Sequence, residues 1–114
     1  MNLESEIYRL SFELSKELEE SDLNKILGVL SSDGVYAMWV YAMDKFKKDQ
    51  QKMNKINDVI EKLNSFVNYS YKGDVNNNSQ DLAQDLNKLL FMKELLERVL
   101  IYARYHAMAK GDEK

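Results

Sequence analysis

The side chains best suited to catalysis or metal binding are the one histidine and the paired carboxylates. An imidazole such as that of His106 needs partners to bind a metal ion or to relay a proton, and no carboxylate lies three or four residues from it. Glu94 and Glu97 have helical spacing, but the di-metal motif of helical bundles is Glu-x-x-His, repeated on a second helix. We therefore expect no catalytic residues, no metal site and no cofactor, and the chain is predicted not to be an enzyme.

Four lysines are the best candidates for nucleic-acid binding. Their spacing is three, four and three residues, so one uninterrupted helix would place all four within about 80° of each other around its axis. Such a strip could contact phosphate groups, each contact adding affinity that salt weakens. Asp44 and Asp49 lie among these lysines and favour the alternative, a solubilising edge beside a core helix. The lysine strip consists of Lys45, Lys48, Lys52 and Lys55.

The stretch 34–48 carries a second candidate surface, for protein binding. It is apolar on nearly all sides, which is typical of a helix that is buried on several sides in a core or at an interface. Trp39 could serve equally as a core residue or as an exposed anchor for a partner. The predicted protein-interface residues are Tyr36, Trp39, Val40 and Tyr41.

Apolar residues at steps of three and four predict that helices must position these groups. The pattern indicates helices over residues 3–20, 23–30, 34–48, 52–67 and 80–109, with Ser21, Asp22 and Asp33 as candidate caps. The polar stretch 47–51 indicates a kink or break, and a further break near residues 87–91 is expected because 30 residues is long for a helix in so small a domain. We expect a main loop at 68–79 and a frayed tail at 111–114. The predicted fold is all-α, a compact bundle of five to six helices.

Length and composition narrow the class of protein. A chain of 114 residues fits a single domain, 1–114, and can bury a hydrophobic core. The absence of cysteine excludes disulfides, zinc ribbons and thiol chemistry. No apolar run reaches the roughly 20 residues of a membrane span, and no signal peptide pattern is present, so we expect a cytoplasmic protein that does not contact membranes.

Two segments together resemble a known family. They are residues 30–43 (LSSDGVYAMWVYAM) and 93–109 (KELLERVLIYARYHAMA). Their pattern is similar to that of the small all-helical subunit of type III-B CRISPR effector (Cmr) complexes: a polar-Gly turn before an apolar helix, and a closing helix with aromatic, Arg and Ala positions.

The resemblance implies a non-catalytic structural role in antiviral RNA interference. Its partners would be the backbone subunits of the complex, further copies of the chain itself, and the backbone of guide RNA paired with target RNA. RNA cleavage would belong to another subunit, and no small-molecule substrate is implied. The alternative that the residues leave open is a helical adaptor or inhibitor that binds protein and has no nucleic-acid contact.

Overall fold

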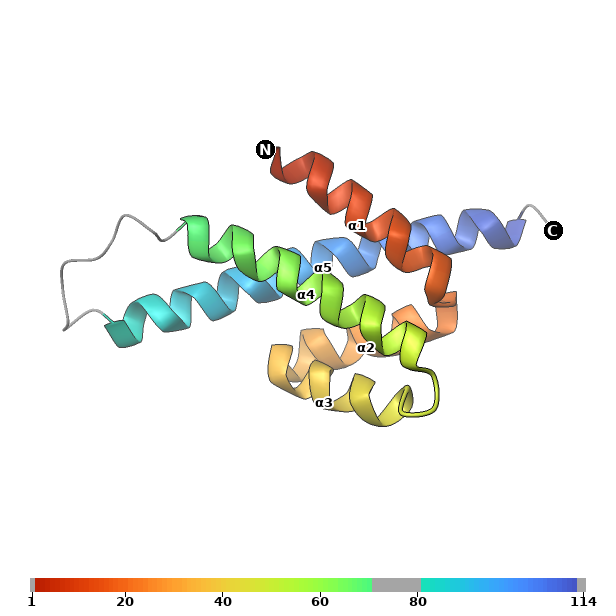
Figure 1. The fold of residues 1–114 in the computed structure, drawn as a ribbon, viewed down its shortest axis with the longest axis horizontal. Helices are drawn as coiled ribbons and strands as arrows, with labels where there is room; N and C mark the ends of the chain where they lie inside the picture. Colours follow the sequence, from red (N-terminus) through yellow and green to blue (C-terminus); the bar gives the residue numbers. More distant parts are fainter. Residues whose placement is uncertain (1, 71–80, 113–114) are drawn as a thin grey trace.

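The computed structural model describes residues 2–70 and 81–112, apart from the side chains of residues 70, 81–84 and 112. The described residues form five helices and the short connections between them, which confirms the predicted all-α bundle (Figure 1). The helices are α1 (Leu3–Glu17), α2 (Glu20–Asp33), α3 (Val35–Lys45), α4 (Gln50–Ser70) and α5 (Asp81–Asp112).

The long helix α5 is the centre of the bundle, because it contacts each of the other four helices. Helix α1 runs parallel to α5: Glu4 pairs with Arg98 near one end, and the Lys110 ammonium donates to the Ser15 carbonyl, 3.3 Å away, near the other. Helices α2 and α4 run antiparallel to α5, and α3 packs mainly against α2 (Figure 1). The lysine strip and the predicted protein-interface residues therefore lie on α3, on α4 and in the turn between them, and not on the central helix α5.

The core forms where the apolar stripes of the helices meet. On α1, Ile7, Leu10 and Leu14 recur at steps of three and four residues, so all three face inward and are almost fully buried. Leu63 on α4 and Val99 on α5 are completely buried against the same cluster. Burial of such side chains contributes roughly 1.5–3 kcal/mol each, which makes this packing the main source of helix stability.

Helix α2 begins earlier than the sequence pattern predicts. Ser21 and Asp22 lie inside the helix, and Glu19 is the capping residue. The Glu19 N–H donates to the Asp22 carboxylate at 3.2 Å, so Asp22 satisfies a backbone donor that precedes the helix. Asp33 likewise does not cap the next helix but is the last residue of α2.

Gly34 separates α2 from α3. Its φ of 97° and ψ of −178° lie in a region that only glycine adopts readily, and its N–H still donates to the Leu30 carbonyl at 3.0 Å. One residue therefore ends α2 and starts α3, which allows the two helices to pack against each other as a hairpin.

The predicted break at 47–51 is confirmed, because α3 ends at Lys45 and α4 begins at Gln50. The Asp49 N–H donates to the Phe46 carbonyl at 2.9 Å, and the Asp49 carboxylate accepts the Lys52 N–H at 3.3 Å, which caps the start of α4. The four lysines of the strip therefore do not lie on one uninterrupted helix. Lys45 belongs to α3, Lys48 to the turn, and Lys52 and Lys55 to α4.

Three other boundaries differ from the prediction. Helix α4 continues to Ser70, so residues 68–70 are helical, while the rest of the predicted 68–79 loop lies outside the described residues. Helix α5 has no break at 87–91 but continues through these residues, and Met92, Leu95 and Leu96, which follow them, are buried against the neighbouring helices. Residues 111–112 belong to α5, and 113–114 lie outside the described residues. None of the helices in the described part of the chain combines the length and apolar character needed to cross a membrane.

Candidate functional site

Two residues of the lysine strip meet at one buried carboxylate. The side chain of Asp22 on α2 is only 10% exposed, and its Oδ2 accepts a hydrogen bond from the Lys52 ammonium at 2.9 Å. The Lys45 ammonium lies 3.7 Å from Oδ1 of the same carboxylate. This arrangement joins α2, α3 and α4 at one point, and we call it the Asp22 clamp.

The clamp stabilises the charged forms of its members. Burial favours the neutral acid and is the largest influence on Asp22, but the Lys52 hydrogen bond, the Glu19 N–H and the two lysine charges together outweigh it and lower the pKa of Asp22. The hydrogen bond to Asp22 raises the pKa of Lys52. Both residues are therefore charged at neutral pH and bound to each other.

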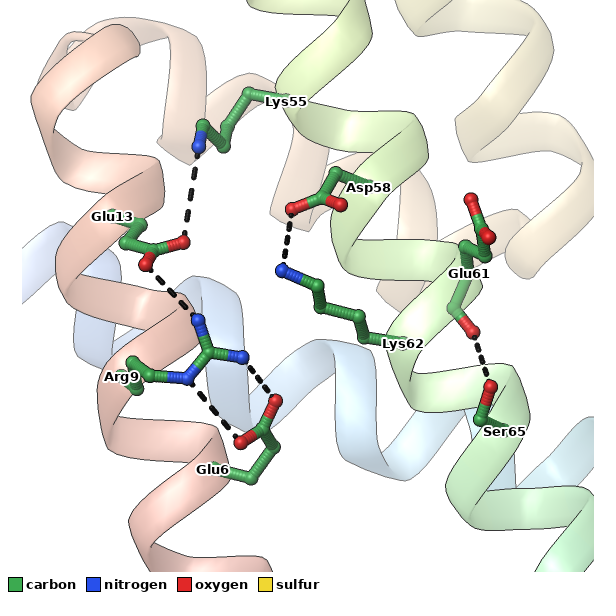
Figure 2. Close-up of polar contacts among 8 residues, drawn as sticks. All are labelled: Glu6, Arg9, Glu13, Lys55, Asp58, Glu61, Lys62 and Ser65. Atoms are coloured by element: carbon green, nitrogen blue, oxygen red, sulfur yellow. Dashed lines mark hydrogen bonds and ion pairs between the residues drawn. The ribbon is translucent and has the colours of Figure 1, made fainter.

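Lys55 is also paired. Its ammonium lies 3.8 Å from the Glu13 carboxylate on α1, and the same carboxylate accepts from the Arg9 guanidinium at 3.0 Å (Figure 2). Arg9 in turn binds Glu6, one turn earlier on α1. Lys55 thus connects α4 to a charged network on α1.

Lys48 differs from the other three lysines. It is exposed in the turn between α3 and α4, and no ion pair between described residues includes it. Lys45, Lys52 and Lys55 each lie beside a carboxylate whose negative charge weakens their attraction for phosphate, so Lys48 is the member of the strip best placed to bind it. Phosphate contact by the strip stays a prediction.

The predicted protein-interface residues fall on two sides of α3. Tyr36 is 76% exposed and Val40 is 40% exposed, and Met43, one turn further on, is 40% exposed as well. These three residues, at steps of four and three, form what we call the outer face of α3. The inner face carries Met38 and Ala42, which are buried in the core.

Trp39 and Tyr41 lie between these two faces. Both are half-buried and pack against the core, and the Trp39 Nε1–H donates to the Asn57 side-chain oxygen on α4 at 3.0 Å. Trp39 therefore connects α3 with α4, which matches the core alternative more closely than the exposed anchor.

A groove of about 730 Å³ lies between α1 and the C-terminal part of α4. The polar side chains on its sides are already paired: Lys62 binds Asp58 at 3.1 Å, and the Ser65 hydroxyl donates to the Glu61 carbonyl at 3.2 Å (Figure 2). Tyr69, which is 75% exposed, lines one end. The lining residues are Glu6, Arg9, Lys62, Ser65, Phe66 and Tyr69. This lining suits binding through van der Waals contact and hydrogen bonds, and it holds no activated nucleophile.

An aromatic cluster between α1 and α5 was not predicted. The His106 ring packs edge-on against Tyr8, at 5.2 Å between ring centroids, and against Phe12, at 5.5 Å. Tyr8 and Phe12 remain 62% and 44% exposed. Tyr8 and Phe12 are four residues apart and lie on the side of α1 away from Leu10 and Leu14. This spacing is the sequence pattern that could have indicated a second apolar face on α1. His106 is thus a packing residue between two aromatic rings.

No three His, Cys, Asp or Glu side chains of the described residues are grouped so that they could hold a metal ion. The described residues form ion-pair networks, a groove between α1 and α4 and exposed apolar faces, which are features found on binding surfaces. Comparison with protein-family models, with curated proteins and with solved structures found no match to this chain.

Proposed function

We propose that this chain is a non-catalytic helical subunit that assembles with other proteins through the outer face of α3. The observation that carries the proposal is the exposure of Tyr36, Val40 and Met43 in one stripe, on a helix whose opposite side is in the core. A helix of this size needs only one apolar side to fold, so the second apolar side is available to a partner.

The chemistry of this face suits protein binding. Tyrosine offers a large apolar surface with a polar tip and is enriched at interfaces, and a flexible methionine adapts to the shape of a partner. Each Å² of apolar surface removed from water contributes roughly 25 cal/mol, so an exposed tyrosine is the largest single contributor on this face.

The assembly that we propose is a type III-B CRISPR (Cmr) RNA-interference complex. The segments that carry the resemblance, 30–43 and 93–109, correspond to the α2–α3 corner with α3 and to the C-terminal half of α5. The first of them contains all three residues of the outer face of α3. In such a complex the chain would pack against backbone subunits, and the lysine strip would lie towards the paired guide and target RNA.

The ion pairs of the lysine strip favour a second candidate function. Since three of its lysines are held by Asp22 and Glu13, the chain could be a protein-binding adaptor or inhibitor without nucleic-acid contact. RNA binding at low salt separates the two functions, because the adaptor should show none, and the salt dependence of any RNA affinity then indicates how many lysines contact phosphate. Contact through Lys48 alone gives a log–log slope of about −1, whereas contact through all four lysines gives a slope of roughly −3 to −4.

Co-purification of the tagged chain from its native cell tests the proposal. We expect CRISPR effector subunits and small guide RNA in the purified complex. Recovery of protein partners without RNA or CRISPR subunits would support the adaptor instead. Recovery of no protein partner would contradict both functions.

A further inference from the structure

Helix α1 carries a row of four exposed side chains at steps of four residues. Each such step advances about 40° around a helix, so the row covers about 120° of α1 and follows one of the ridges along which helices commonly pack. Its order along the chain is acidic, aromatic, aromatic and basic. The row consists of Glu4, Tyr8, Phe12 and Lys16, and we call it the α1 ridge.

The α1 ridge is open to a partner. Helix α5 contacts it through Arg98, which pairs with Glu4, and through His106, which packs against the two aromatic rings. The Glu4 side chain nevertheless stays 67% exposed, and both rings stay exposed as well. Figure 1 shows α1 along the upper edge of the bundle. The described residues therefore leave room for another helix on the ridge.

We propose that the α1 ridge binds the same ridge of a second copy of this chain, with the two α1 helices antiparallel. The ridge is self-complementary about its midpoint. Antiparallel pairing places Glu4 of each copy opposite Lys16 of the other, and Tyr8 opposite Phe12. Two ion pairs then flank two aromatic pairs, and aromatic rings in contact attract each other beyond the burial of their area.

The monomer leaves the charges at both ends ready for this contact. No ion pair between described residues includes Lys16, whose ammonium lies 4.8 Å from the centre of the Phe12 ring. The Glu4 carboxylate binds Arg98 through Oε1, so its Oε2 can accept from Lys16 of the other copy. The neighbouring Glu17 does not oppose the pairing, because it lines a small pocket with Gln51 on the α4 side of α1.

Charge complementarity favours a second copy over other occupants. A nucleic acid, or a protein surface of one charge sign, would be attracted by one end of the ridge and repelled by the other. A parallel pair of copies would place the two Glu4 carboxylates beside each other, and the two Lys16 ammonium groups as well. The antiparallel copy is the arrangement in which both ends of the ridge meet an opposite charge.

Analytical ultracentrifugation of the full chain over a range of concentrations tests the pairing. We expect a monomer–dimer equilibrium whose dissociation constant rises at least tenfold in Phe12→Ser. Tyr36→Ser is the matched control, since it removes an exposed aromatic side chain from α3, and it leaves the equilibrium unchanged. Glu4→Lys and Lys16→Glu each weaken the dimer, and the double variant restores it. Circular dichroism verifies that every variant remains helical, and the charge variants alter exposed side chains, so they keep the test valid where Phe12→Ser affects folding.

Cysteine cross-linking tests the direction of pairing, because the chain has no cysteine of its own. A mixture of Glu4→Cys and Lys16→Cys should form a disulfide-linked dimer on oxidation. Neither variant should do so alone, because antiparallel pairing separates the two copies of position 4, or of position 16, by about 18 Å along the axis.

A monomer at all concentrations, or efficient cross-linking of either cysteine variant alone, overturns the proposal. A dimer that Phe12→Ser and the two single charge variants leave intact overturns it as well. The proposal concerns a different face from the proposed function. Loss of the dimer therefore leaves partner binding by the outer face of α3 unchanged, and loss of partner binding through Tyr36 leaves the dimer unchanged.

Discussion

Replacement of Asp22 by alanine removes the buried carboxylate that joins three helices. The variant loses the 2.9 Å hydrogen bond from the Lys52 ammonium, the weaker attraction of Lys45 and the bond from the Glu19 N–H. The two lysines remain close to each other with no carboxylate between them. We therefore expect α2 to lose both its cap and its connection to α4.

The expected loss of stability in Asp22→Ala is the sum of what the separate contacts of Asp22 contribute. A hydrogen bond to a charged group contributes about 1.5 kcal/mol at the lower end of its range, and loss of a cap costs about 0.5 kcal/mol at the lower end of its own. The lower ends apply because the Lys52 side chain is 22% exposed, so water replaces part of what Asp22 provides. Asp22→Ala should lower the free energy of unfolding by about 2 kcal/mol, measured by urea denaturation at pH 7.

The pH dependence gives an independent test of the same contact. Because folding lowers the pKa of Asp22, its contribution to stability is fully present above the pKa of the unfolded state and is lost as the pH falls through the folded-state pKa. Because folding raises the pKa of Lys52, its contribution is present below its unfolded pKa and is lost as the pH rises through the folded value. As the pH moves from neutral to acid or to alkaline values, the free energy of unfolding of Asp22→Ala should therefore fall by less than that of the wild type.

Asp44→Ala is the matched control. Asp44 also pairs with a lysine, Lys47, but at 3.8 Å and with its side chain 83% exposed, so its removal should change stability by less than about 0.5 kcal/mol. Equal losses for the two variants, or a loss below about 0.5 kcal/mol for Asp22→Ala, would refute the argument that burial gives the clamp its strength.

Three further predictions concern packing and the backbone, and urea denaturation measures each of them. Leu63→Ala removes a completely buried side chain and should cost about 3 kcal/mol, and a cost below about 1 kcal/mol would exclude Leu63 from the core. Trp39→Phe keeps an aromatic ring but loses the bond to Asn57, so we expect a cost of about 1 kcal/mol that the additional change Asn57→Ala does not increase. Gly34→Ala should cost about 2 kcal/mol through backbone strain alone, since open space surrounds the new methyl group; an unchanged stability would show that the α2–α3 turn tolerates other residues.

The fold class and most helices were predictable because they depend on local spacing. Leu10 and Leu14 or Ile56 and Leu63 recur at helical steps, and no proline interrupts the chain. The break between α3 and α4 was predictable from its run of polar residues. The start of α2 was not, because Glu19 is not among the preferred capping residues and acts only together with Asp22.

The candidate sites were less predictable because they depend on contacts between distant residues. The lysines show regular spacing in the sequence, but nothing local shows that Lys52 meets Asp22, which is 30 residues away. In the same way, the spacing within α3 shows that it is apolar on several sides, but only the packing of the helices shows that Tyr36 is exposed while Trp39 contacts α4.

A parallel pull-down with the tagged wild-type chain and its Tyr36→Asp variant tests the central claim most directly. Phe12→Asp, which alters an exposed aromatic residue on α1, is the control, and circular dichroism verifies that all three proteins are folded. We predict that the wild type and the Phe12 variant recover the same CRISPR effector subunits from native cell extract, and that the Tyr36 variant loses them. Equal recovery with the Tyr36 variant would contradict the assignment of the outer face of α3 as the binding surface.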